Sequence, residues 1–208
     1  MITLLALLAP NLSFAERSGV PPMPPRTQTY VFICDNKASY TVRTSEIDAW
    51  VFRPHGTLHL YATNDTASTT YADKGFAISI DGQQATFISP SGKQLSCHND
   101  TRQAVWEKAK LDGADFRAVG NEPGWSLVIM ANSRIILVSD YGSSRIEVAL
   151  PKPQTNMATR TTRWNAGDLI LEVTGHQCHD SMSGEVFEST AVVTTKTQTL
   201  HGCGRALH

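Results

Sequence analysis

The chain has 208 residues, with 18 basic and 19 acidic side chains, a formal net charge of −1, and 41% hydrophobic residues. This length is enough for one or two globular domains. The chain is nearly neutral, and its sequence contains no basic stripe of the kind that binding to a phosphate backbone requires. We therefore expect no nucleic-acid partner.

Residues 1–15 form an apolar run that ends in Ser13-Phe14-Ala15, a small-x-small pattern. A run this short cannot span a bilayer and is typical of a secretory signal peptide. The alternative is a buried N-terminal strand, which Pro10 and Asn11 disfavour. Residues 16–27 are rich in proline and predict an extended linker. We therefore expect an exported mature chain without a transmembrane segment.

Residues 28–100 contain short apolar runs that alternate with polar residues, separated by turn signals such as Pro54-His55-Gly56 and Asp81-Gly82. Many short strands of this kind are typical of a closed antiparallel barrel or a sandwich. The predicted strands are 30–34, 40–44, 49–52, 57–62, 76–80, 85–88 and 94–97.

One helix is predicted, over residues 101–113. Asp100 is a suitable N-cap, and Gln103 three residues later would complete a capping box. Gly113 suits the position just after the helix. The segment separates the strands before it from a second β-rich region.

Residues 114–208 again alternate with period two, and Pro151 to Gln154 indicate a longer crossing loop. The predicted strands are 126–130, 135–139, 145–149, 169–174, 191–195 and 199–203. The sequence therefore predicts an all-β protein, with two small antiparallel β-barrel or sandwich modules joined by a short helix.

The four cysteines allow three pairings, and an exported chain with an even count usually oxidises them. The composition break at the helix favours nearest neighbours, so we expect one disulfide in each module, Cys34–Cys97 and Cys178–Cys203. The alternative is a zinc or copper site. Its ligands would come from the set His176, Cys178, His179, His201 and Cys203.

Two further segments of the second module carry polar groups. Glu122 lies in an Asn-Glu-Pro-Gly-Trp turn, as a candidate acid or as a partner for Arg117. Asp180 and nearby serines lie beside His179, but no Gly-x-Ser-x-Gly elbow is present. We expect neither an enzyme nor a bound cofactor, and the sequence defines no oligomeric state.

A set of segments in residues 28–100 resembles the MliC-type inhibitors of c-type lysozyme. The segments are Tyr30–Cys34, Leu58–Leu60, Ala67–Tyr71, Asp81–Phe87 and Cys97. That family consists of small periplasmic or lipid-anchored β-barrels of Gram-negative bacteria, with a cysteine near the first strand bonded to one in the last. The resemblance implies a barrel of this kind in the periplasm or outer envelope.

Inhibitors of this family insert two loops into the lysozyme cleft, where hydroxyl and ammonium groups meet the two catalytic carboxyl groups. The resemblance places the first loop at Ser68, Thr69, Thr70 and Tyr71. Asp81 stands where the family has a lysine in the second loop, and Lys74 is a candidate replacement for that charge. A carboxylate there is repelled by the carboxyl groups of the cleft.

Residues 116–125, 178–184 and 202–204 resemble an uncharacterised family of bacterial envelope proteins, which implies secretion and a β-rich fold. Three functions follow as hypotheses. The first is binding of c-type lysozyme by loop insertion. The second is an envelope structural or adhesive module that has lost inhibition, and the third is a metal-binding second domain.

Overall fold

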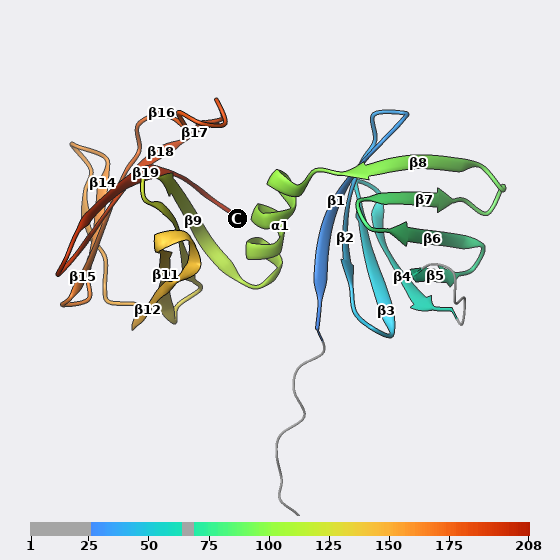
Figure 1. Cartoon of the computed structure of the whole chain (residues 1–208), viewed down its shortest axis with the longest axis horizontal. Helices are drawn as coiled ribbons and strands as arrows, with labels where there is room; N and C mark the ends of the chain where they lie inside the picture. Colours follow the sequence, from blue (N-terminus) through green and yellow to red (C-terminus); the bar gives the residue numbers. More distant parts are fainter. Residues whose placement is uncertain (1–25, 64–68) are drawn as a thin grey trace, which may run out of the picture.

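The computed structural model describes residues 26–63 and 69–208 (Figure 1). The predicted signal peptide and residues 16–25 of the predicted linker lie outside the described residues. The described part of the chain is all-β with one α-helix, and it forms two modules, each with one disulfide. The predicted fold class is confirmed. In Figure 1 the two modules lie on either side of the helix.

The first module is a closed barrel of eight antiparallel strands in chain order, in which β1 also pairs with β8. Seven of the strands match the predicted ones. The missed strand is β5, where Tyr71 is the one buried residue, so no alternation is visible in its sequence. The strands are β1 (Gln28–Cys34), β2 (Ser39–Thr44), β3 (Asp48–Arg53), β4 (Gly56–Ala62), β5 (Thr69–Asp73), β6 (Phe76–Asp81), β7 (Gln84–Ile88) and β8 (Gln94–Asn99).

The barrel is filled by the inward-facing residues of its strands, as expected for eight strands. Phe32, Val42, Val51 and Ile78 are fully buried there. The Cys34–Cys97 disulfide joins β1 to β8, where the two cysteines are register partners. The predicted pairing is confirmed, and it ties together the first and last strands of the barrel.

Helix α1 (Thr101–Leu111) begins where the sequence predicts. The Asp100 carboxylate accepts hydrogen bonds from the backbone N–H groups of Arg102 and Gln103, at 3.1 Å each. The second half of the predicted capping box is replaced, because the Asp100 N–H donates to the Val31 carbonyl of β1 at 2.7 Å. The start of the helix is thereby attached to the barrel.

The helix contacts both modules. Trp106 and Ala109 are buried against the second module, where they pack with Phe187. On the barrel side, Arg43 of β2 forms an ion pair of 2.7 Å with Asp112, the C-cap of the helix. The helix that joins the two modules is therefore packed against both of them.

The second module is a curled nine-stranded sheet in the order β12-β11-β10-β9-β19-β18-β15-β14-β13, with a separate β16–β17 ribbon. Strands β12 and β13 follow each other in the chain but form opposite edges, so the predicted crossing at Pro151 is confirmed. The elements are β9 (Ala114–Asn121), β10 (Gly124–Met130), β11 (Arg134–Ser139), η1 (Asp140–Gly142), β12 (Ser144–Ala149), β13 (Gln154–Asn156), β14 (Thr161–Asn165), β15 (Leu169–Thr174), β16 (Cys178–His179), β17 (Val186–Phe187), β18 (Ser189–Thr195) and β19 (Thr199–Ala206).

Both faces of this sheet are packed near its centre. The inner face holds a core that includes Leu127, Leu171 and Val193, all fully buried. The outer face of β9 and β19 is covered by α1 and by the β16–β17 ribbon. The Cys178–Cys203 disulfide, the second predicted pair, attaches the ribbon to β19.

Candidate functional site

The loops that the lysozyme-inhibitor resemblance singles out lie at one end of the barrel. In an up-and-down barrel the β2–β3, β4–β5 and β6–β7 connections share one end, and the other turns share the opposite end. Thr69 pairs with Ile80, so the start of β5 lies beside Asp81. Thr69 and Asp81 are exposed and Thr70 is half-buried. Ser68 lies outside the described residues.

Tyr71, which the resemblance places in the first loop, is buried and does not belong to this surface. Its side chain is 3% exposed and belongs to the barrel core. Its hydroxyl donates to the Ser45 carbonyl at 2.8 Å. Burial raises the pKa of Tyr71, so the phenol stays neutral. Tyr71 points inward because it shares the inward-facing register with Ile78, its partner on β6.

Lys74 lies away from Thr69 and Asp81. It lies in the turn between β5 and β6, next to the pair Asp73–Phe76 that closes the hairpin. That turn is at the opposite end of the barrel from Asp81. The Lys74 ammonium is exposed, 3.8 Å from Asp73. It therefore lies too far from Asp81 to take the place of the family lysine, because the length of β5 separates them.

Sequence reasoning missed a group of exposed aromatic and apolar side chains beside the predicted loops. Ile47 is 73% exposed, Trp50 is 42% exposed and Tyr61 is 54% exposed. Together with His59 they form what we call the aromatic surface. Ile47 is in the β2–β3 connection, and its carbonyl accepts a 2.9 Å hydrogen bond from the Ala62 N–H at the end of β4. The surface therefore adjoins the β4–β5 connection.

The side chains of the aromatic surface are stacked on one another. The rings of Trp50 and His59, which are register partners, lie 3.9 Å apart at an angle of 11°. The His59 and Tyr61 rings are 4.6 Å apart at 50°. The outward-facing positions of β3 and β4 place these rings outside the barrel. An alternation count that included the outward residues would have found them.

Asp48 fixes the His59 ring in this stack. Its carboxylate lies 2.7 Å from His59 Nε2 and accepts a hydrogen bond of 2.5 Å from the Ser45 hydroxyl. The hydrogen bond from Ser45 lowers the pKa of Asp48 and outweighs burial, with His59 contributing in the same direction. Asp48 is therefore a carboxylate near neutral pH. The stack is held in place before any partner binds.

The cysteine- and histidine-rich segments of the second module form a structural joint. Cys178 and Cys203 are bonded to each other, so they are not available as thiolate ligands and the predicted alternative metal set does not form. Among the described residues no group of three or more potential metal-binding side chains converges. His176, His179 and His201 are all exposed.

A cleft of about 340 Å³ lies beside this joint and includes Asp180. The Asp180 carboxylate accepts hydrogen bonds from the Ser183 N–H at 2.7 Å, the Ser183 hydroxyl at 2.8 Å and the Asn121 amide at 2.8 Å. Burial opposes ionisation, but these bonds outweigh it and lower the pKa of Asp180. Asp180 therefore orders a turn, and its bond to Ser183 differs from a nucleophile–histidine arrangement.

Arg117 does not pair with Glu122. Arg117 points to the outer face of β9, where its guanidinium lies 5.4 Å from the centre of the Trp106 ring, and Arg205 lies 4.4 Å from the same ring. Glu122 is exposed in its turn. Glu122 lines the cleft that also includes Asp180.

Comparison with protein-family models, with curated proteins and with solved structures gives no match for this chain. Within the described residues, no helix has the length and apolar character needed to cross a membrane.

Proposed function

We propose that the protein is a non-catalytic binding protein whose barrel engages a protein partner through the aromatic surface and the adjoining β4–β5 and β6–β7 connections. The observation that carries this proposal is the exposure of Trp50 and Tyr61 next to Ile47 at one end of the barrel. Exposed tryptophan and tyrosine side chains are enriched among the residues that dominate binding energy in interfaces.

The partner that the family resemblance supports is c-type lysozyme. Thr69 and Thr70 bring two hydroxyl groups to the same end of the barrel as the aromatic surface. Hydroxyl groups can hydrogen-bond to the carboxyl groups of a glycosidase cleft. The stacked rings would add apolar contact outside the cleft. The disulfides support the proposed location in the periplasm or outer envelope, because disulfides persist in oxidising compartments.

A second candidate function is favoured by Asp81. This carboxylate is exposed at the proposed contact end and has no cation within 4 Å among the described residues. It would meet the two carboxyl groups of a lysozyme cleft and be repelled. The second candidate is an envelope module that uses the same aromatic surface for adhesion or assembly and does not inhibit lysozyme.

Two assays on the purified mature chain separate the candidates. Egg-white lysozyme is first titrated with the protein while lysis of bacterial cell walls is followed. The lysozyme proposal expects lysis to stop at micromolar protein, and unchanged lysis at micromolar excess contradicts it. Asp81→Lys restores the family charge and is expected to strengthen inhibition.

The second assay measures binding of lysozyme to variants of the surface. Trp50→Ala and Tyr61→Ala are expected to weaken binding more than tenfold, the size of an interface hot spot. Tyr141→Ala is the matched control, because Tyr141 is 83% exposed on the second module. A loss with Tyr141→Ala equal to that with Trp50→Ala would contradict the assignment of the surface.

A further inference from the structure

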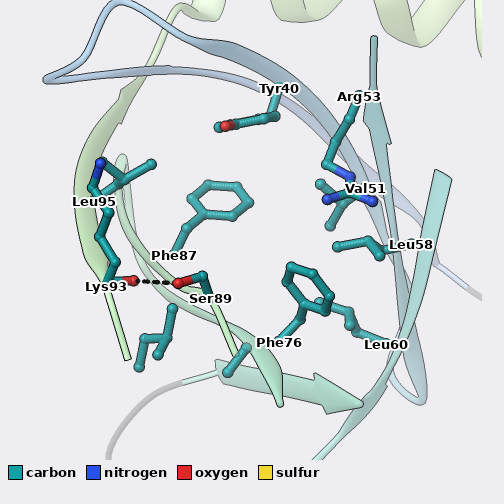
Figure 2. A pocket seen from close by; sticks show the side chains of 12 residues that line it. Tyr40, Val51, Arg53, Leu58, Leu60, Phe76, Phe87, Ser89, Lys93 and Leu95 are labelled. Atoms are coloured by element: carbon teal, nitrogen blue, oxygen red, sulfur yellow. Dashed lines mark hydrogen bonds between the residues drawn. The ribbon is translucent and has the colours of Figure 1, made fainter. Parts of the chain in front are cut away.

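The opposite end of the barrel contains a small apolar cavity (Figure 2). Its volume is about 90 Å³, and its walls include Val51, Leu58, Leu60, Phe76 and Phe87. Leu58 and Phe76 lie at the starts of β4 and β6, and Phe87 lies near the end of β7. We call this space the mouth cavity. It lies away from the aromatic surface, so its function is independent of the one proposed above.

Two cations border the mouth cavity, and no acidic residue lines it. Figure 2 shows Arg53 and Lys93 on opposite walls, with the rings of Tyr40 and Phe87 between them. Neither cation forms an ion pair with the described residues. An apolar space bordered by unpaired cations is complementary to a molecule that is apolar at one end and anionic at the other.

The Arg53 guanidinium is positioned but retains free donors. Its Cζ lies 5.2 Å from the centre of the Phe76 ring, and its Nε donates one long hydrogen bond, 3.4 Å, to the Gly56 carbonyl. That is its one hydrogen bond to the described residues, so the two terminal nitrogens can receive an anion. An arginine fork binds a carboxylate through two parallel hydrogen bonds.

The size of the cavity restricts the apolar part of the ligand. An engineered cavity of about 150 Å³ holds benzene, whereas a single water needs roughly 10–15 Å³. The mouth cavity lies between these values, so a slender alkyl chain fits better than a ring system. Mouths of β-barrels are frequent places for small ligands.

We propose that the mouth cavity binds the alkyl end of a medium-chain carboxylate, whose carboxylate group is held by the Arg53 guanidinium, while Lys93 adds positive charge from the opposite wall. The alkyl chain replaces water against Leu58, Phe76 and Phe87. The carboxylate remains at the rim, where it is partly hydrated. The site therefore selects an anionic amphiphile over a neutral one of equal length.

Sodium octanoate and 1-octanol are the probes, titrated into the full mature chain while backbone amide shifts are followed by NMR. Octanoate is expected to shift the amides of Leu58, Phe76 and Phe87 and to bind at least fivefold more tightly than octanol. From butanoate upwards, affinity should rise about fourfold for each methylene buried and then level off when the cavity is full. Equal affinity for the acid and the alcohol, or shifts confined to other parts of the chain, would overturn the proposal.

Charge variants test the rim. Arg53→Gln and Lys93→Gln are each expected to weaken octanoate about threefold to fivefold, as for a partly exposed ion pair, and to leave octanol unchanged. Lys74→Gln is the control, because Lys74 is at the same end of the barrel but does not line the cavity. A Lys74→Gln effect as large as that of Arg53→Gln would show non-specific attraction and overturn the assignment. The comparison of acid with alcohol on the unmodified chain stands even if a variant unfolds.

Discussion

Gly202→Ala tests the packing of β19 against β9 and β10 in the second module. Gly202 lies on β19 opposite the Trp125 side chain of β10, and the Trp125 indole N–H donates to the His201 carbonyl at 3.2 Å. A Cβ on Gly202 would lie 2.7 Å from Trp125 Cζ2 and even closer to the backbone oxygen of Val119. The backbone of β9 cannot move aside cheaply, because β9 pairs with β10 and β19.

The expected cost is that of overpacking a close-packed core, at the upper end of about 1–3 kcal/mol. For a module of about 100 residues, a loss of about 2–3 kcal/mol lowers the midpoint of thermal unfolding by roughly 10–20 °C. Gly175→Ala is the matched control. Its Cβ would meet its nearest neighbour, Arg160 Cβ, at 3.6 Å, an ordinary contact.

Hydrogen exchange in increasing urea, analysed by peptide, measures the effect module by module. Peptides from β9, β10 and β19 should lose protection at lower urea in Gly202→Ala, whereas the barrel peptides serve as an internal reference. A free energy of unfolding of Gly202→Ala within about 0.5 kcal/mol of that of Gly175→Ala would contradict this prediction.

Three further predictions concern stability. Replacing both cysteines of a disulfide with serine should lower the free energy of unfolding, measured in urea, because the closed loops of 63 and 25 residues are released. The expected loss is about 4 kcal/mol for Cys34–Cys97 and about 3.5 kcal/mol for Cys178–Cys203. Four free thiols in the denatured, unreduced chain would contradict both pairings. Asp180→Asn should destabilise the second module at neutral pH. Burial opposes ionisation, but the hydrogen bonds from Ser183 and Asn121 lower the folded pKa of Asp180. Its contribution is therefore present above the unfolded pKa, near 4, and is lost as pH falls through the folded pKa. A stability difference between wild type and variant that does not shrink as pH falls below about 4 would refute this. Trp106→Ala should lower the free energy of unfolding by about 3–5 kcal/mol and remove hydrogen-exchange protection from α1. The reason is that Trp106 is 5% exposed and packs between the helix and the second module. Retained protection would show that the barrel alone holds the helix.

The parts of the fold that the sequence predicted are those with a local signal. The helix was predicted because Asp100 and Gly113 mark its ends: Asp100 is the N-cap, and Gly113 follows the C-cap Asp112 with a φ of +89°. In the second module the predicted strands omit β9, β13, β14, β16 and β17. Strand β9 is packed on both faces, so small and charged residues such as Ala118 and Arg117 replace a plain alternation of apolar and polar residues. Strand β5 escaped prediction because only Tyr71 faces the core.

The candidate site was predicted only in part, for a related reason. A motif gives the order of residues along the chain but not the end of the barrel at which each one lies. Thr69 and Asp81 share an end, and Lys74 is at the other because one strand separates it from them. The aromatic surface was not predicted because Trp50 and Tyr61 occupy outward-facing positions of β3 and β4, and the alternation that marks a strand concerns its inward-facing residues.

By itself, the sequence determined the positions of most strands, the capped helix and the even cysteine count, because hydrophobic alternation and capping act over a few residues. The tertiary structure alone decided why Gly202 must lack a side chain, and that Trp50 and Tyr61 both contact the His59 ring beside the β4–β5 connection. Each of these depends on which strands are neighbours and in what register. Register is set by contacts between residues far apart in the chain, and a local pattern contains no record of them.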